Sequence, residues 1–166
     1  MYTVTHKEKT LAIIIPAGYN QPGVHFFTPN NFSQQLAYMH HPVGQKIKAH
    51  THNEVKREVL KTLEVLFIRK GDLRVDFYES GGKYLESYIM HAGDTILLVS
   101  GGHGFECLNE VEMIEVKQGP FAGDQDKTLL PAVEPDAIRI KRHGPIHTRQ
   151  PAKALRQRAA VLNPVH

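Results

Sequence analysis

The sequence predicts an all-β protein, either a sandwich or a barrel of short strands. Runs rich in apolar and β-branched residues recur along most of the chain, and each is only a few residues long. Turn-forming residues, chiefly glycine, proline, asparagine and aspartate, separate these runs at short intervals. Many short strands with regularly spaced turns are typical of β-sandwiches and β-barrels. Strands are expected over residues 11–15, 24–27, 35–41, 46–52, 64–69, 73–78, 84–90, 95–99, 104–108 and 112–117.

Each expected strand in the first half of the chain is limited by a breaker or a polar motif. Pro16 ends the first run, and Pro22 and Gly23 precede the second. The third run follows a Pro-Asn-Asn turn and ends at His40 and His41, and the fourth ends in a His-Thr-His triplet. The following segment, residues 53–62, is the exception to the β pattern, because its mixed charged and aliphatic residues favour a helical or loop insert.

Glycine-containing pairs delimit the expected strands of the second half. Gly71-Asp72, Gly81-Gly82, Gly93-Asp94 and Gly101-Gly102 fall between successive runs, and Asn109-Glu110 follows the run at 104–108. Such pairs form the tight turns of β-hairpins. This half of the chain is therefore expected to form successive antiparallel strands.

Length and composition fit one small domain. The chain has 166 residues, of which 41% are hydrophobic, and no apolar run has the eighteen or more residues of a membrane span. The amino-terminal residues lack the apolar centre of a secretory signal. The single cysteine, Cys107, cannot form an internal disulfide and favours a reducing compartment, so a cytoplasmic protein is expected.

The distribution of charge divides the chain into two parts. All 17 acidic residues and 13 of the 20 Lys and Arg lie in residues 1–136, which carry a net charge of −4, whereas residues 137–166 carry +7. We therefore expect a β domain over 1–136 and a basic carboxyl-terminal extension over 137–166. The extension has no aromatic residue on which a base could stack, so a nucleic-acid partner is not expected.

Histidines and one glutamate occur at the spacing of metal ligands. His50 and His52 are two residues apart in an expected strand, so their side chains point to the same face. Glu64 opens the next strand, and His103 follows the turn after the run at 95–99. Three imidazoles and a carboxylate suit one divalent ion, which could be Fe, Mn, Ni, Co, Cu or Zn.

These residues resemble the two motifs of the cupin superfamily. The first motif is a glycine, five residues, His-x-His, a glutamate, six residues and a glycine, and it is matched over residues 44–71. The second begins with Gly-Asp and ends with a histidine and an asparagine, and it is matched from Gly93 through His103 to Asn109. The sequence departs from the family in having eleven residues between His52 and Glu64, where three or four are usual, and in lacking the proline of the second motif.

The resemblance implies a double-stranded β-helix, or jelly roll, with a metal site in its interior. The implied metal ligands are His50, His52, Glu64 and His103. The long spacer leaves Glu58 as an alternative carboxylate. Tyr38, His40, Phe105 and Cys107 are expected to line a substrate pocket. Phe105 and Cys107 share strand parity with His103, and one of His40 and His41 should face inward by alternation. Small single-domain cupins commonly dimerise, so the resemblance also implies a homodimer.

The reaction is not fixed by this resemblance, because one fold supports many functions. Segments around Glu64 and His103 are similar to stand-alone cupins found among surface-polysaccharide genes. This similarity favours a small-molecule ligand and, as the leading hypothesis, a sugar or sugar-derivative isomerase or epimerase. An Fe(II)-dependent dioxygenase and a non-catalytic binder or sensor of a small ligand are the alternatives.

Overall fold

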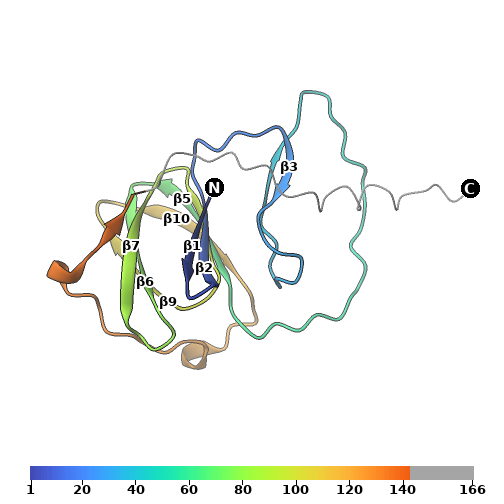
Figure 1. Cartoon of the computed structure of the whole chain (residues 1–166). Helices are drawn as coiled ribbons and strands as arrows, with labels where there is room; N and C mark the ends of the chain where they lie inside the picture. Colours follow the sequence, from blue (N-terminus) through green and yellow to red (C-terminus); the bar gives the residue numbers. More distant parts are fainter. Residues whose placement is uncertain (143–166) are drawn as a thin grey trace, which may run out of the picture.

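The fold is built on two β-sheets that face each other (Figure 1). The structure is a computed structural model and describes residues 1–142. The first sheet has the strand order β1-β2-β8-β5-β10, and all its neighbours are antiparallel. Its strands are β1 (Tyr2–His6), β2 (Lys9–Ile15), β8 (Thr95–Leu98), β5 (Glu64–Lys70) and β10 (Glu112–Lys117).

The second sheet has the order β11-β7-β6-β9, and a separate hairpin pairs β3 with β4. The second sheet consists of β11 (Ile140–Lys141), β7 (Tyr84–His91), β6 (Asp72–Tyr78) and β9 (Gly102–Cys107), and the hairpin of β3 (Gly23–Phe26) and β4 (Ala37–His40). Two 3₁₀ turns, Gly123–Asp126 and Pro135–Ala137, are the helical elements of the described residues. The all-β prediction is therefore confirmed. Within residues 1–142, no helix is long and apolar enough to cross a membrane.

The core lies between the facing sheets and follows from strand alternation. Leu66 and Ile68 of β5 point inward from the first sheet, and Leu73, Val75 and Phe77 of β6 point inward from the second. All five side chains are at most 2% exposed. Because successive residues of a strand point to opposite faces, this period-two pattern places one apolar face of each strand in the core.

The outer face of the first sheet is covered by the β3–β4 hairpin and the segment around it. Ile13, Val65 and Leu97 face outward and pack with Leu36 and Phe27. This second apolar layer explains why the outward positions of β2 and β5 are apolar as well. The hairpin therefore lies on the opposite side of the first sheet from the core.

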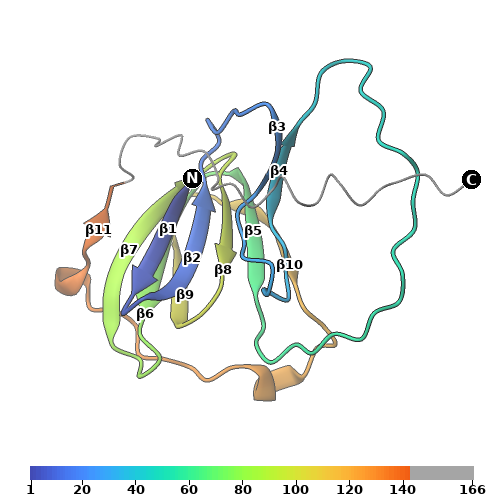
Figure 2. The ribbon, with the colours of Figure 1, turned by 45° about the vertical axis from the view of Figure 1, so that its right-hand side comes forward.

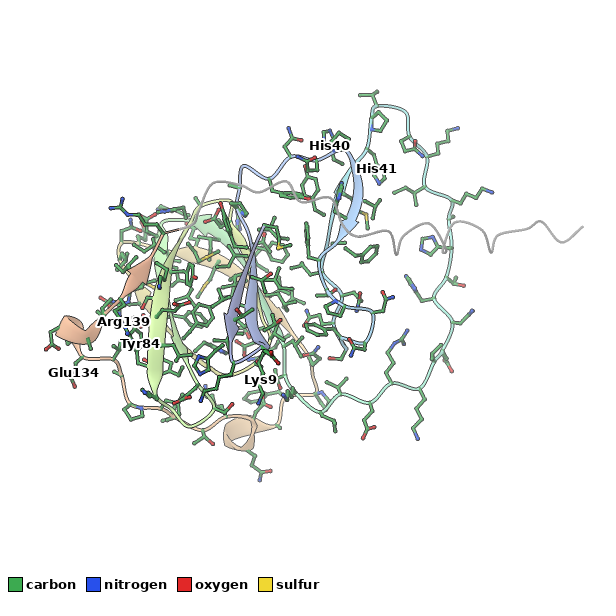
Figure 3. All side chains as sticks on the ribbon, in the orientation of Figure 1. Lys9, His40, His41, Tyr84, Glu134 and Arg139 are labelled. Atoms are coloured by element: carbon green, nitrogen blue, oxygen red, sulfur yellow. The ribbon has the colours of Figure 1, made fainter. Side chains whose placement is uncertain are left out.

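A buried polar network holds the outer face of the second sheet. Arg74 forms two hydrogen bonds to the Asp76 carboxylate, at 2.8 and 3.0 Å, and the hydroxyl of Ser87 donates to the same carboxylate. The Tyr84 hydroxyl contacts Ser87 and accepts a hydrogen bond from the backbone N–H of Arg139 (Figure 3). β11 then pairs with β7, so the sheet continues beyond residue 136, the boundary expected from the charge. Residues 143–166, most of the expected basic extension, lie outside the described residues.

Residues 46–52 were expected to form a strand, and this prediction is wrong. Residues 41–61, which we call the arm, contain no strand or helix, and all of them are exposed. The arm runs well clear of both sheets between β4 and β5 (Figures 1 and 2). A strand needs a neighbour that accepts and donates its backbone hydrogen bonds, and none of the described strands pairs with the arm. The insert at 53–62 is accordingly a loop rather than a helix.

Three residues of the two sequence motifs shape turns. Gly71 has φ +82°, and a side chain there would collide with the carbonyl oxygen of Glu110. Asn109 bonds both the backbone N–H and the carboxylate of Asp72, each at 2.7 Å. Asp94 accepts hydrogen bonds from the backbone of Ala17 and His91, each at 2.8 Å. Gly71 thus lies in the turn between β5 and β6, Asp94 precedes β8, and Asn109 follows β9.

The polar network on the second sheet gives the first prediction. Arg74→Met should destabilise the fold by about 3–5 kcal/mol, because it leaves the buried Asp76 carboxylate without its cation. Urea unfolding followed by circular dichroism measures this change. The control is Glu106→Gln, which removes the half-exposed second partner of Arg74 and should cost less than about 1 kcal/mol. Equal effects of the two substitutions would contradict the role assigned to the Arg74–Asp76 pair.

Candidate metal centre

Glu64 and His103 form a pair that connects the two sheets. Glu64 is the first residue of β5, and His103 lies near the start of β9. Nε2 of His103 is 3.1 Å from Oε2 of Glu64. Glu64 shares the inward face of β5 with Leu66, and His103 lies opposite the buried Phe77 of β6. Two of the four expected metal ligands are thus brought together at one end of the interior.

Lys117 is a third polar residue at this end, and the sequence analysis did not identify it. It lies directly opposite Glu64 in the β5–β10 pairing, and its Nζ is 3.8 Å from Oε1 of Glu64. It also pairs with Glu115 at 2.9 Å. Directly opposed residues of an antiparallel pair share a face, so strand register places Lys117 here. No motif spacing marks it in the sequence.

The surroundings of Glu64 favour its ionised form. The hydrogen bond from His103 is the main cause that lowers the pKa of the Glu64 carboxyl. Burial acts in the opposite direction, and the charges of His103, Lys117 and Lys127 lower the pKa further. A carboxylate that stays ionised is available as an acceptor or as a ligand for a cation.

His50 and His52 lie on the arm, away from Glu64 and His103. Their ring centroids are 5.3 Å apart, and the rings are nearly perpendicular. Nδ1 of His50 is 2.9 Å from the carbonyl oxygen of Lys48, which fits a ring that donates from Nδ1 and leaves Nε2 as a free lone pair. Within residues 1–142, no three His, Cys, Asp or Glu side chains stand close enough together to hold a metal ion. The four expected ligands are therefore two separate pairs in this structure.

The two candidate carboxylates have different surroundings. Glu64 begins a strand, contacts His103 and is only 19% exposed. Glu58 belongs to the arm and is exposed. Of these two carboxylates, Glu64 is the one beside a histidine of the second motif.

The expected pocket residues also fall into two groups. Phe105 and Cys107 lie two and four residues after His103 on β9, so all three share one face of the strand. They lie opposite the buried Val75 and Leu73, so this face points to the interior. The Phe105 ring is 5.3 Å from that of His103. Tyr38 and His40 belong instead to the β3–β4 hairpin, where the Tyr38 ring packs edge-on against Tyr19 at 4.9 Å.

His40 and His41 mark the point where the chain leaves the hairpin for the arm (Figure 3). Both are exposed. The structure therefore places the Phe105–Cys107 pair beside His103, and the Tyr38–His40 pair on the other side of the first sheet.

The comparisons with known proteins add no relative. Searches of protein-family models, curated proteins and solved structures found nothing that matches this chain.

The Glu64–His103 pair gives the second prediction. His103→Ala should raise the pKa of Glu64, because the hydrogen bond from His103 is the largest influence that lowers it. A lowered carboxyl pKa stabilises the folded state above the ordinary pKa, and this stabilisation is lost as the pH falls through the folded-state value. Acidification should therefore cost the wild type more stability than the variant.

Carboxyl-carbon NMR titration of metal-free protein measures the pKa of Glu64 directly. His91→Ala is the matched control, because His91 pairs with Asp72 instead. An unchanged Glu64 pKa in the His103→Ala variant would contradict this account of the pair.

Proposed function

We propose that this protein is a single-domain cupin with a jelly-roll fold that binds one divalent metal ion through His50, His52, Glu64 and His103. The observation that carries the proposal is the Glu64–His103 pair. Its oxygen and nitrogen are 3.1 Å apart, and two ligands bound at right angles to one ion with bonds of about 2.1 Å would lie about 3 Å apart. These two atoms could therefore become ligands of one ion with little movement.

The remaining two ligands fit the same chemistry. His50 and His52 are exposed and separated by one residue. In an extended segment such residues point to the same face, so an extended arm would present both rings to one ion. Neutral imidazoles and a carboxylate form sites for first-row transition metals and zinc. Glu64 is ionised by its surroundings, as a metal ligand must be.

The proposed activity is isomerisation or epimerisation of a sugar or a sugar derivative. A bound divalent ion supplies Lewis-acid polarisation of a carbonyl or hydroxyl oxygen. Phe105 and Cys107 provide a mostly apolar inner wall beside His103, and Lys117 adds a cation that can hold an anionic or hydroxyl oxygen of the ligand. We place the protein in the cytoplasm, in keeping with its single cysteine.

Metal content gives the third prediction. Protein purified without a metal-affinity column should contain or take up about one equivalent of a divalent ion, as measured by elemental analysis. Glu64→Gln and His50→Ala should each weaken binding by more than about 100-fold, since even a partner of a ligand is worth 10–100-fold. Glu58→Gln and His91→Ala are the matched controls and should bind as the wild type does. Uptake of less than about a tenth of an equivalent by the wild type would overturn the proposal.

Oxygen dependence gives the fourth prediction and separates the two enzyme classes. Metal-loaded protein should convert a substrate sugar without oxygen, because isomerisation only moves protons and electrons within the substrate. A panel of free and nucleotide-linked sugars, assayed anaerobically by NMR, tests this. An oxygen electrode run on the same panel is the control. Turnover that needs Fe(II) and consumes O₂ would replace the isomerase with a dioxygenase.

A further inference from the structure

Two edge strands next to the candidate centre have no partner on one side. β9 pairs only with β6, and β10 pairs only with β5, among the described residues. His103 lies on β9, and Lys117 lies on β10, so both edges adjoin the Glu64–His103 pair. Exposed edge strands present free N–H and C=O groups that can pair with another segment.

The inner faces of these strands are also uncovered. Phe105 lies opposite Val75, and Met113 lies opposite Ile68, so both point toward the core. Val75 and Ile68 are at most 2% exposed, whereas Phe105 and Met113 are each 41% exposed. Apolar side chains that face inward but remain accessible indicate that a covering element is missing on this side.

The arm has the properties of that covering element. Val43, Ile47 and Leu60 are respectively 106%, 64% and 85% exposed, so the arm carries exposed apolar side chains. The arm contains five Lys or Arg and two Glu, a net charge of +3, whereas residues 102–117 contain one Lys and four Glu, a net charge of −3. Two of these glutamates, Glu106 and Glu110, pair with Arg74 and Lys70 of the neighbouring strands. The arm is therefore basic where residues 102–117 are acidic, and both segments carry exposed apolar side chains.

The arm is directed away from its own sheets. The hydrogen bonds recorded for Gln45, His50 and Arg57 run to other arm residues. Figures 1 and 2 show from two directions that the arm loops outward between the β3–β4 hairpin and β5. A segment held in this way is placed to meet another molecule, and every copy of the chain carries both the arm and the free edges.

We infer that two copies of this chain exchange their arms, and that residues 46–52 of each copy add a strand to the free edge of β9 in the other. This inference rests on the proposed metal site. The exchange brings His50 and His52 of one copy to Glu64 and His103 of the second copy. A two-fold exchange closes on itself, since the same arm-to-edge contact occurs twice. The dimer then contains two metal sites, and each is built from both chains.

A mixed dimer tests the exchange. One chain carries His50→Ala and His52→Ala, the other carries Glu64→Gln and His103→Ala, and two different non-metal affinity tags allow the mixed dimer to be purified. Exchange leaves one intact site per mixed dimer, so elemental analysis should find about one ion per two chains. Each variant alone should bind less than about a tenth of an equivalent. A mixed dimer without metal, beside a wild type that binds it, would show that the arm folds back on its own chain and would overturn the exchange.

A disulfide test does not depend on metal. In an antiparallel pairing with His52 or His50 opposite His103, the residue opposite Cys107 is Lys48 or Lys46 respectively. Lys48→Cys or Lys46→Cys should therefore form a disulfide-linked dimer with the natural Cys107, which is exposed. Ala49→Cys points to the opposite face and should not, and Cys107→Ser should abolish the link.

Non-reducing gels of the full chain give the answer. A linked dimer in one lysine variant but not in Ala49→Cys supports exchange, even if the wild type proves to bind no metal. A disulfide within a single chain, or no disulfide in either lysine variant, overturns it. The gel thus separates failure of the exchange from failure of the proposed metal site.

Discussion

The structure depends on burying the apolar side chains between its two sheets, away from water. Strand alternation gives each sheet an apolar inner face, and the two inner faces enclose Leu66, Leu73, Val75 and Phe77 almost completely. This enclosure is incomplete toward the edge strands β9 and β10. There Phe105 faces the same interior yet remains 41% exposed. The candidate centre lies at this open side, where a polar pair can contact both the interior and an incoming segment.

The motif residues divide between building the fold and building the centre. Gly71, Asp94 and Asn109 determine turns through a left-handed φ or through hydrogen bonds to backbone N–H groups. Glu64 and His103 lie at the opposite ends of their strands from these turns, near the starts of β5 and β9. The glycine, aspartate and asparagine of the motifs are thus explained by the turns that they form. The histidines and the glutamate carry its chemical information.

Most of the fold could be predicted from the sequence because alternation and turn residues are local signals. The runs at 64–69, 73–78 and 112–117 each correspond to an observed strand. β1 and β11 were missed, since each is short and has polar residues at alternate positions or at an end. These strands depend on pairing with β2 and β7, and pairing is not a local property.

The candidate centre could be predicted only in part for the same reason. Glu64 and His103 are close because β5 and β9, from different sheets, face each other. The sequence motifs predicted that these two residues belong to one site. Residues 46–52 have the composition of a strand, but composition supplies no neighbour, and none of the described strands pairs with them. Lys117 lies at the centre because the β5–β10 register places it opposite Glu64. The spacing of residues along the sequence does not reveal that register.

A site assembled from two chains would couple metal binding to association. Each ion that binds only the dimer stabilises it by mass action, and the dimer in turn raises the affinity for the ion by the same factor. The net charges of the arm and of residues 102–117, +3 and −3, would add an attraction that weakens with salt. The arm's exposed apolar residues contribute a term that salt does not screen. In such a dimer, the eleven residues between His52 and Glu64 would give the two histidines the reach to contact a second copy.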